Sequence, residues 1–189
     1  MRLFVGVDLP AEIKKTLLEF QSELRHLGIS GSWKSLDNFH ITLEFIGEIE
    51  SDRISALTET LTKVGGNFKP FCLTIAGLGA FPSLKQPHTL WTAVSGSLTD
   101  LNQLRYDLHH ELKIRGFDLD ERQFKPHITL ASRPKLDKHD FSPVLTKILG
   151  EFMVVEVVLF ESRAIGGKRV YTDLYSAGLE KGSDKYVVD

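Results

Sequence analysis

The sequence contains very little cysteine: Cys72 is the only one among 189 residues. An intramolecular disulfide framework and a cysteine-based zinc site are therefore excluded. Cys72 lies in a strand-like stretch, where we expect it to act as a small buried hydrophobic residue and not as a nucleophile.

Long hydrophobic runs are also missing. No stretch approaches the roughly 20 consecutive apolar residues that a membrane-spanning helix needs. The apolar run that precedes Asp8 is too short for the hydrophobic region of a signal peptide. We therefore expect no membrane partner and a cytoplasmic location.

An excess of positive charge is the third absence. The 23 Lys and Arg residues are balanced by 25 Asp and Glu residues, which gives a formal net charge of -2. A strongly electropositive nucleic-acid binder is therefore excluded, although a local basic cleft is compatible with this balance. The hydrophobic fraction of 42% and the length suit one globular domain, or two small lobes that share a core.

The sequence does contain the tetrapeptide His-Ile-Thr-Leu twice, beginning at His40 and at His127. In a β-strand, side chains alternate between faces, so the odd-numbered residues of 39–45 share a core face while His40 and Thr42 project from the other. The second copy repeats this parity with His127 and Thr129. Each predicted strand thus offers an apolar side to a core and a His/Thr pair to the opposite side.

Two such pairs that face one another across a cleft would suit a phosphate diester. One neutral imidazole can take a proton from water while the other, protonated, gives a proton to the leaving oxygen. The threonine hydroxyls can donate hydrogen bonds to phosphate oxygens as negative charge grows on them. A single histidine on a strand is usually structural, and it is the matched pair that favours a catalytic site.

The remaining pattern predicts an α+β protein with four helices and seven or eight strands. The second motif begins 127 − 40 = 87 residues after the first, close to half the chain, which favours an internal duplication. The helices are expected at 11–26, at 52–64 with Asp52 as N-cap, at 99–114 and at 141–149, and the strands at 3–9, the two motifs, 71–78, 89–94, 151–161 and 170–179.

With their flanking residues, the two motifs resemble the signature of the two-histidine (2H) phosphoesterase superfamily. Within it the chain is most similar to the RNA 2′,3′-cyclic phosphodiesterases, also described as 2′-5′ RNA ligase-like proteins. The resemblance extends from the opening MRLFVGVDLP through LGAFPS to LFESR at 159–163. It implies a bilobal, pseudo-two-fold fold in which two antiparallel sheets line a central cleft and helices lie outside. We expect residues 1–181 to form this single domain and 182–189 a flexible tail.

The same resemblance implies hydrolysis of RNA 2′,3′-cyclic phosphate ends to 2′-phosphomonoesters. By position, His40 would be the proton donor and His127 the proton acceptor that activates water. Thr42 and Thr129 would bind phosphate oxygens. No metal and no other cofactor is implied, and the expected partners are RNA ends or small cyclic nucleotides that bind a monomer.

Other side chains near the motifs are candidates of a second rank. Similar proteins commonly carry an arginine five positions after the second histidine, but this sequence has Ser132 there, followed by Arg133. Strict alternation puts Arg133 on the His127 face as a phosphate contact, the alternative being an exposed charge at a strand end. Phe81 is the first candidate for stacking on a base and Trp33 the second, and filling the core is the alternative for each.

Two polar residues are open to more than one interpretation. By parity Glu44 shares the His40 face, where it either orients an imidazole or meets solvent. His109 falls in a polar helical stretch and is expected on the surface. Arg163 and Lys168 are weaker candidates for phosphate contacts and are expected to be solvated or paired.

Three other functions use the same residues. The cleft could bind a nucleotide or an RNA end without turnover, or it could join RNA ends through a 2′-5′ bond. In the third, the histidines bind a metal. The His-x-Thr spacing disfavours this third function because it lacks the His-x-His pattern that puts two imidazoles on one strand face.

Overall fold

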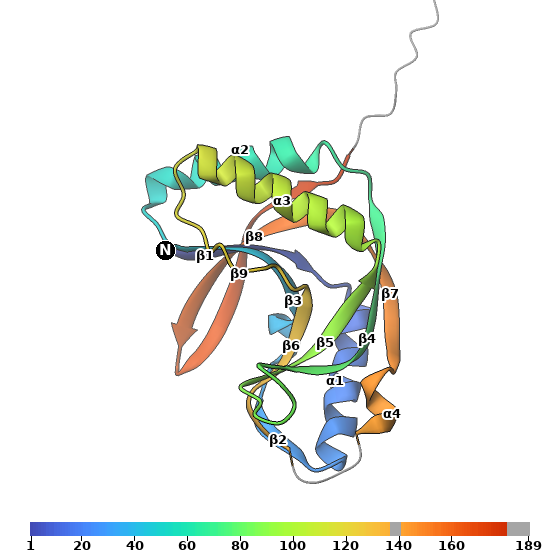
Figure 1. The fold of residues 1–189 in the computed structure, drawn as a ribbon. Helices are drawn as coiled ribbons and strands as arrows, with labels where there is room; N and C mark the ends of the chain where they lie inside the picture. The colour runs from blue at the N-terminus through green and yellow to red at the C-terminus, as the bar shows by residue number, and fades with distance from the viewer. Residues whose placement is uncertain (137–140, 181–189) are drawn as a thin grey trace, which may run out of the picture.

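The computed structural model describes residues 1–136 and 141–180 and confirms the α+β fold (Figure 1). The predicted tail at 182–189 lies outside the described residues. In chain order the elements are β1 (Arg2–Asp8), α1 (Ala11–His26), β2 (Ile29–Trp33), the 3-10 turn η1 (Leu36–Asn38), β3 (His40–Glu48), η2 (Ser51–Arg53), α2 (Ile54–Gly65), β4 (Phe71–Phe81), β5 (Thr89–Gly96), α3 (Leu98–Ile114), β6 (His127–Leu136), α4 (Ser142–Leu145), β7 (Ile148–Val154), β8 (Glu156–Ile165) and β9 (Lys168–Gly178).

The strands form two antiparallel sheets that have the same internal order. One sheet runs β3-β1-β8-β9 and the other β2-β6-β5-β4-β7. If β2 is set aside, β3-β1-β8-β9 corresponds strand for strand to β6-β5-β4-β7, and a motif strand begins each series. This correspondence is the internal two-fold relation that the repeated tetrapeptide predicts.

The helices cover the outer faces of the sheets and leave the motif strands facing each other. Helix α2 packs on β8 and β9, α3 packs on β3, and α1 packs on β2 and β7, while β3 and β6 contact one another (Figure 1). Helix α3 shows why these positions are occupied: its leucines recur every three or four residues and are fully buried. They are Leu101, Leu104, Leu108 and Leu112.

The predicted helix at 141–149 and strand at 151–161 are wrong in their boundaries. Helix α4 ends at Leu145, and the chain then forms β7 and β8, which separate at Val155. The residues of β7 are drawn into a strand because they pair with β4, as in the register of Phe152 opposite Leu73. A partner strand that lies about 80 residues earlier in the sequence overrides the local preference for helix.

Three smaller expectations also differ from the structure. Helix α2 begins at Ile54, after the 3-10 turn that contains Asp52, so Asp52 is not its N-cap. The sequence pattern predicts no strand at 29–33, but β2 forms there and pairs with β6. Cys72 is exposed, because it lies opposite the exposed Met153 on the outer side of β4.

Among the described helices, none combines the length and the apolar character that crossing a bilayer requires.

Candidate active site

The two motif strands present their side chains to opposite faces as predicted. In β3, Ile41 and Leu43 are buried, while His40 and Thr42 are only partly covered. The same alternation holds in the tetrapeptide that begins at His127. Burial of the apolar side in the core fixes the direction of both His/Thr pairs, because a strand cannot turn one face without turning the other.

Both strands carry a β-bulge directly after this alternation. Consecutive residues of β1 pair with Thr42 and Glu44, which leaves Leu43 without a partner, and Leu130 is left out of the β5–β6 ladder in the same way. A bulge inserts one residue and reverses the parity of everything that follows. Phe45 is therefore 56% exposed, and the expectation that it lies in the core is wrong.

All four motif side chains line one cleft between the sheets. The cleft has a volume of about 530 Å³, and His40, Thr42, His127 and Thr129 all contribute to its wall. A second compartment of about 500 Å³ shares Thr42, His127 and Thr129 with the first. The two compartments thus meet at the motif residues, and each volume falls in the range of small-molecule sites.

The two imidazoles are held in the same tautomer by equivalent hydrogen bonds. His40 Nδ1 lies 3.0 Å from the carbonyl oxygen of Asn38, and His127 Nδ1 lies 2.7 Å from that of Lys125. A carbonyl can only accept, so Nδ1 carries the proton in each neutral ring and Nε2 keeps its lone pair. His40 Nε2 also lies 3.0 Å from Thr42 Oγ1 and can accept a hydrogen bond from that hydroxyl.

Burial makes both rings poor bases in the free protein. It lowers the pKa of His40 to about 4, and the Asn38 carbonyl and Asp8 oppose this shift while the charges of His127 and Lys34 add to it. Burial also lowers the pKa of His127, against the effect of the Lys125 carbonyl. Both imidazoles are therefore neutral at pH 7 when no anion is present.

Comparison with known proteins identifies the family of this chain. The profile of the family described as LigT like Phosphoesterase matches residues 7–91 and 94–171. The chain belongs to this family. The resemblance inferred from the motifs is thereby confirmed.

Several known proteins match this LigT-like phosphoesterase over nearly its whole length. It is 30% identical to the RNA 2′,3′-cyclic phosphodiesterase of Thermotoga maritima, over 98% of this chain and 100% of the relative. A crystal structure from Thermus thermophilus superposes with a TM-score of 0.81 at 26% identity, covering 97% of this chain and 100% of that one. Escherichia coli LigT complexed with 3′-AMP gives a TM-score of 0.79 at 27% identity, covering 94% and 97% of the two chains.

In this LigT-like phosphoesterase, the imidazoles of His40 and His127 each lie nearly perpendicular to an aromatic ring. The Tyr171 and His40 rings are 5.1 Å apart at 87°, and the Phe81 and His127 rings are 4.9 Å apart at 87°. The sequence had indicated Phe81 but not Tyr171. Tyr171 lies on the final strand β9, far from either motif in the sequence, and no local pattern marks it as a neighbour of His40.

The other two predicted contacts lie away from the cleft wall. After the bulge, Ser132 lines the cleft, whereas Arg133 has a left-handed backbone with φ 50° and hydrogen-bonds Ser32 Oγ at 3.3 Å. Trp33 is partly buried against the core, with the guanidinium of Arg25 4.7 Å above its ring. The alternation argument for Arg133 fails because the extra residue of the bulge shifts the parity.

Glu44 belongs to a buried ion-pair network and does not face solvent. Its side chain is 2% exposed, and Oε2 accepts a hydrogen bond from His109 Nδ1 at 2.7 Å and forms an ion pair with Arg105 Nη2 at 3.1 Å. Burial raises the pKa of Glu44, and the hydrogen bond from His109 and the charge of Arg105 oppose this rise. His109 is thus not the surface residue that the helical pattern predicted. The network fastens the motif strand β3 to α3.

Within residues 1–136 and 141–180, no three His, Cys, Asp or Glu side chains gather closely enough to hold a metal ion. No metal-ligand set can therefore be named for this part of the chain.

Proposed function

We propose that this protein hydrolyses the 2′,3′-cyclic phosphate at an RNA 3′ end, or in a small cyclic nucleotide, to a 2′-phosphomonoester. The observation that carries the proposal is that two imidazoles and two hydroxyls, placed by equivalent strands, line a single cleft. The name of the Thermotoga maritima relative and the 3′-AMP bound by Escherichia coli LigT support the same substrate class.

The proposed reaction divides acid and base work between the two motifs. His127 accepts a proton from water through the lone pair on Nε2, and the water oxygen forms a bond to phosphorus. The P–O3′ bond breaks, and protonated His40 gives its Nε2 proton to O3′. The product keeps the phosphate on O2′, and proton exchange with solvent restores both rings. The residues alone account for these steps, and the proposal assigns none of them to a metal.

The substrate itself prepares His40 for its role as acid. In the free protein the pKa of His40 is about 4, so the ring is neutral. A phosphate anion in the cleft favours the imidazolium form and raises this pKa. Once Nε2 is protonated, it no longer accepts from Thr42, and the hydroxyls of Thr42 and Thr129 can donate to the non-bridging phosphate oxygens.

The regiochemistry of the product tests this proposal. We expect the protein, in the presence of EDTA, to convert adenosine 2′,3′-cyclic phosphate to 2′-AMP alone, as separated from 3′-AMP by chromatography. Accumulation of 3′-AMP would reverse the assignment of O3′ as the leaving atom. Absence of any product between about pH 5 and 8 would leave a binding module in place of a hydrolase.

We also propose that Phe81 stacks on the base of the terminal nucleotide. Phe81 lines the second compartment beside His127. Base stacking on an aromatic ring contributes about 1 to 3 kcal/mol, so Phe81→Ala should raise KM by about tenfold or more and change kcat less. Tyr106→Ala, which removes an exposed ring from α3 outside both compartments, is the matched control. An unchanged KM for Phe81→Ala would contradict the stacking role.

A further inference from the structure

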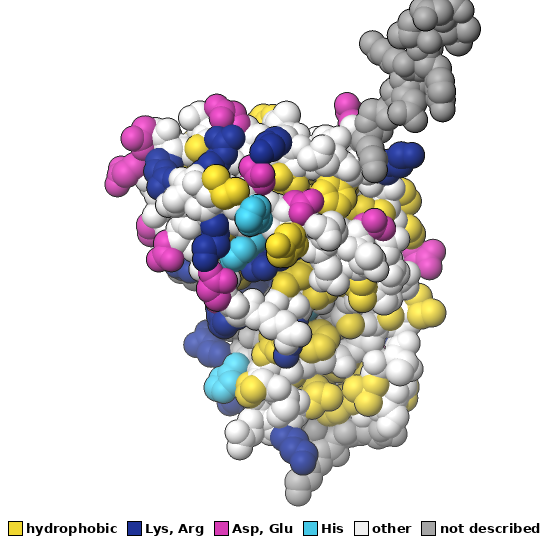
Figure 2. All heavy atoms as spheres, turned by 45° about the horizontal axis from the view of Figure 1, so that its top comes forward, with side chains coloured by type: hydrophobic (Ala, Val, Ile, Leu, Met, Phe, Trp, Pro, Cys, Tyr) yellow, Lys and Arg dark blue, Asp and Glu magenta, His cyan; other side chains and the backbone are white. Residues whose placement is uncertain are grey.

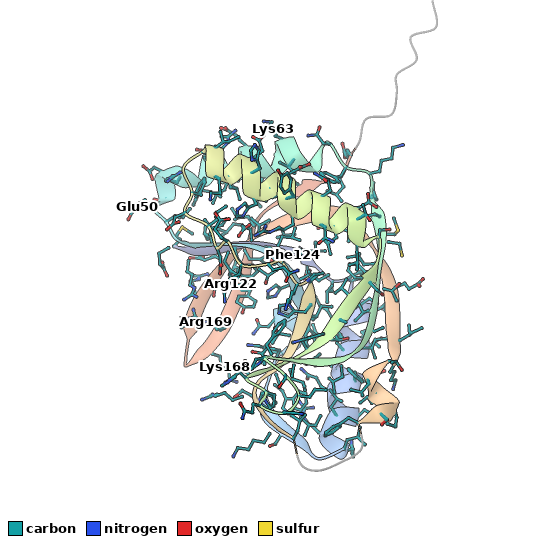
Figure 3. The ribbon with its side chains drawn as sticks, in the orientation of Figure 1. Glu50, Lys63, Arg122, Phe124, Lys168 and Arg169 are labelled. Atoms are coloured by element: carbon teal, nitrogen blue, oxygen red, sulfur yellow. The ribbon has the colours of Figure 1, made fainter. Side chains whose placement is uncertain are left out.

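Four cationic side chains line the larger compartment, and only one of them is neutralised. They are Arg2, Lys34, Arg122 and Arg169. Arg122 is paired with Asp120, which accepts from its Nε at 2.6 Å and from its backbone nitrogen at 2.9 Å. No carboxylate of the described residues forms an ion pair with Arg2, Lys34 or Arg169. We call these three residues the basic triad. Figure 3 shows Arg122 and Arg169 reaching the same side of the molecule from different segments.

The basic triad gathers at the His40 end of the cleft. Arg2 comes from β1, Lys34 follows β2, and Arg169 comes from β9. The charges of Arg2 and Arg169 both act on the hydroxyl of Tyr171, whose ring lies against His40. The charges of Lys34 and Arg169 also act on each other. Phe81, by contrast, lines the compartment beside His127.

Lys34 and Arg169 of the triad form hydrogen bonds to neutral groups, which do not neutralise their positive charges. The Lys34 backbone nitrogen donates to the Leu130 carbonyl at 2.9 Å. Asn38 Nδ2 donates to the Arg169 carbonyl at 3.0 Å, and Arg169 Nη1 donates to Ser162 Oγ at 3.5 Å. The fold therefore fixes the backbone at Lys34 and Arg169, and the one hydrogen bond of the Arg169 guanidinium goes to a neutral hydroxyl, which leaves its charge free to bind an anion.

Three like charges in a concave site destabilise one another unless an anion offsets them. The composition does not force this arrangement, since the net charge is -2, and over α2 and α3 acidic and basic side chains are interspersed (Figure 2). The accumulation of unpaired positive charge is thus a local property of the cleft and not a consequence of the overall composition. Such a site suits a phosphate in addition to the one that reacts at the motifs.

We propose that Arg2, Lys34 and Arg169 bind a second phosphate, the one attached to O5′ of the terminal nucleotide. This inference rests on the proposed function and narrows its substrate class to the ends of RNA chains, in which O5′ carries the internucleotide phosphodiester. The cyclic phosphate then lies where the two compartments meet, and the preceding phosphate lies on the His40 side. A nucleoside cyclic phosphate without a 5′-phosphate leaves the triad unfilled.

The experiment compares three substrates: adenosine 2′,3′-cyclic phosphate, its 5′-phosphorylated form, and the dinucleotide ApA with a 2′,3′-cyclic end. We expect the 5′-phosphate to raise kcat/KM by about tenfold, as one charge-assisted contact does. The dinucleotide should show a similar gain, which extends the result from a terminal phosphate to a diester. The slope of log kcat/KM against log salt should be steeper by about 0.7 for each added phosphate contact.

Substitutions in the triad identify the residues responsible. Arg169→Gln should remove most of the gain that the 5′-phosphate brings, and Arg2→Gln provides a second, independent variant at an exposed position. Arg163→Gln is the matched control, because Arg163 lies on the same β8–β9 hairpin, pairs with Glu161 at 3.3 Å and does not line the cleft. The control should keep the full gain.

Equal kcat/KM values with and without the 5′-phosphate in the unmodified protein would overturn the inference. So would a gain that both triad variants retain. Binding constants for 2′-AMP and adenosine 2′,5′-bisphosphate test the second phosphate without turnover. If no substrate is hydrolysed but the bisphosphate still binds more tightly, the proposed function fails while the second phosphate site stands.

Discussion

Replacing His127 by alanine is expected to lower kcat by about 10² to 10⁴, the usual contribution of a positioned acid or base. The same range applies to His40→Ala. Because water attack and departure of O3′ belong to one displacement, each imidazole is useful only when the other is present. The double variant should therefore be scarcely slower than either single variant, and the two losses should not multiply.

Stability measurements separate this catalytic role from a structural one. The imidazoles face the cleft, while the neighbouring Ile41 and Ile128 are fully buried and hold the strands in the core. Thermal unfolding of the alanine variants should therefore remain close to that of the unmodified protein. His110→Ala, which changes an exposed histidine of α3, is the control for both assays. Unfolding of the motif variants, or losses that multiply in the double variant, would contradict concerted acid and base roles.

The sequence was sufficient to predict the centre of the site because its information there is local. Alternation within each tetrapeptide places His40 with Thr42 and His127 with Thr129, whatever the rest of the chain does. The repetition at nearly half the chain length then indicates that two equivalent strands are brought together. Both conclusions depend on the period of a strand and on no distant contact.

The residues around this centre could not be predicted because distant segments determine them. The bulges at Leu43 and Leu130 arise from pairing with β1 and β5, and they decide that Ser132, not Arg133, lines the cleft. The buried pair of Glu44 and His109 joins residues 65 positions apart. These polar residues have nothing unusual in their own segments, so no local pattern distinguishes them. They are Glu44, His109, Ser132 and Arg133.

Activity should depend on pH through a bell-shaped curve whose optimum for kcat/KM lies below about pH 6.5. The reaction needs one neutral and one protonated imidazole, and kcat/KM reports the free protein. Below both pKa values no base remains, and above both no acid remains, so the maximum lies between them. Burial places the pKa of His40 at about 4 and lowers the pKa of His127 below its ordinary value of about 6.5. The two values belong to the coupled pair and not to either ring alone.

The bell for kcat should be displaced to higher pH than the bell for kcat/KM. In the complex, the negative phosphate favours both imidazolium forms and raises both pKa values. At saturating substrate the protonated imidazole therefore persists to higher pH, whereas at low substrate the rate on the alkaline side falls about tenfold per pH unit.

Initial rates from about pH 4 to 9 at constant ionic strength measure both curves. Asp8→Asn removes a negative charge that raises the pKa of His40. The side of the pH–rate curve that depends on His40 should therefore move to lower pH. A flat profile would mean that no imidazole titrates in the reaction, and coincident optima would mean that the substrate does not raise the pKa of its own acid catalyst.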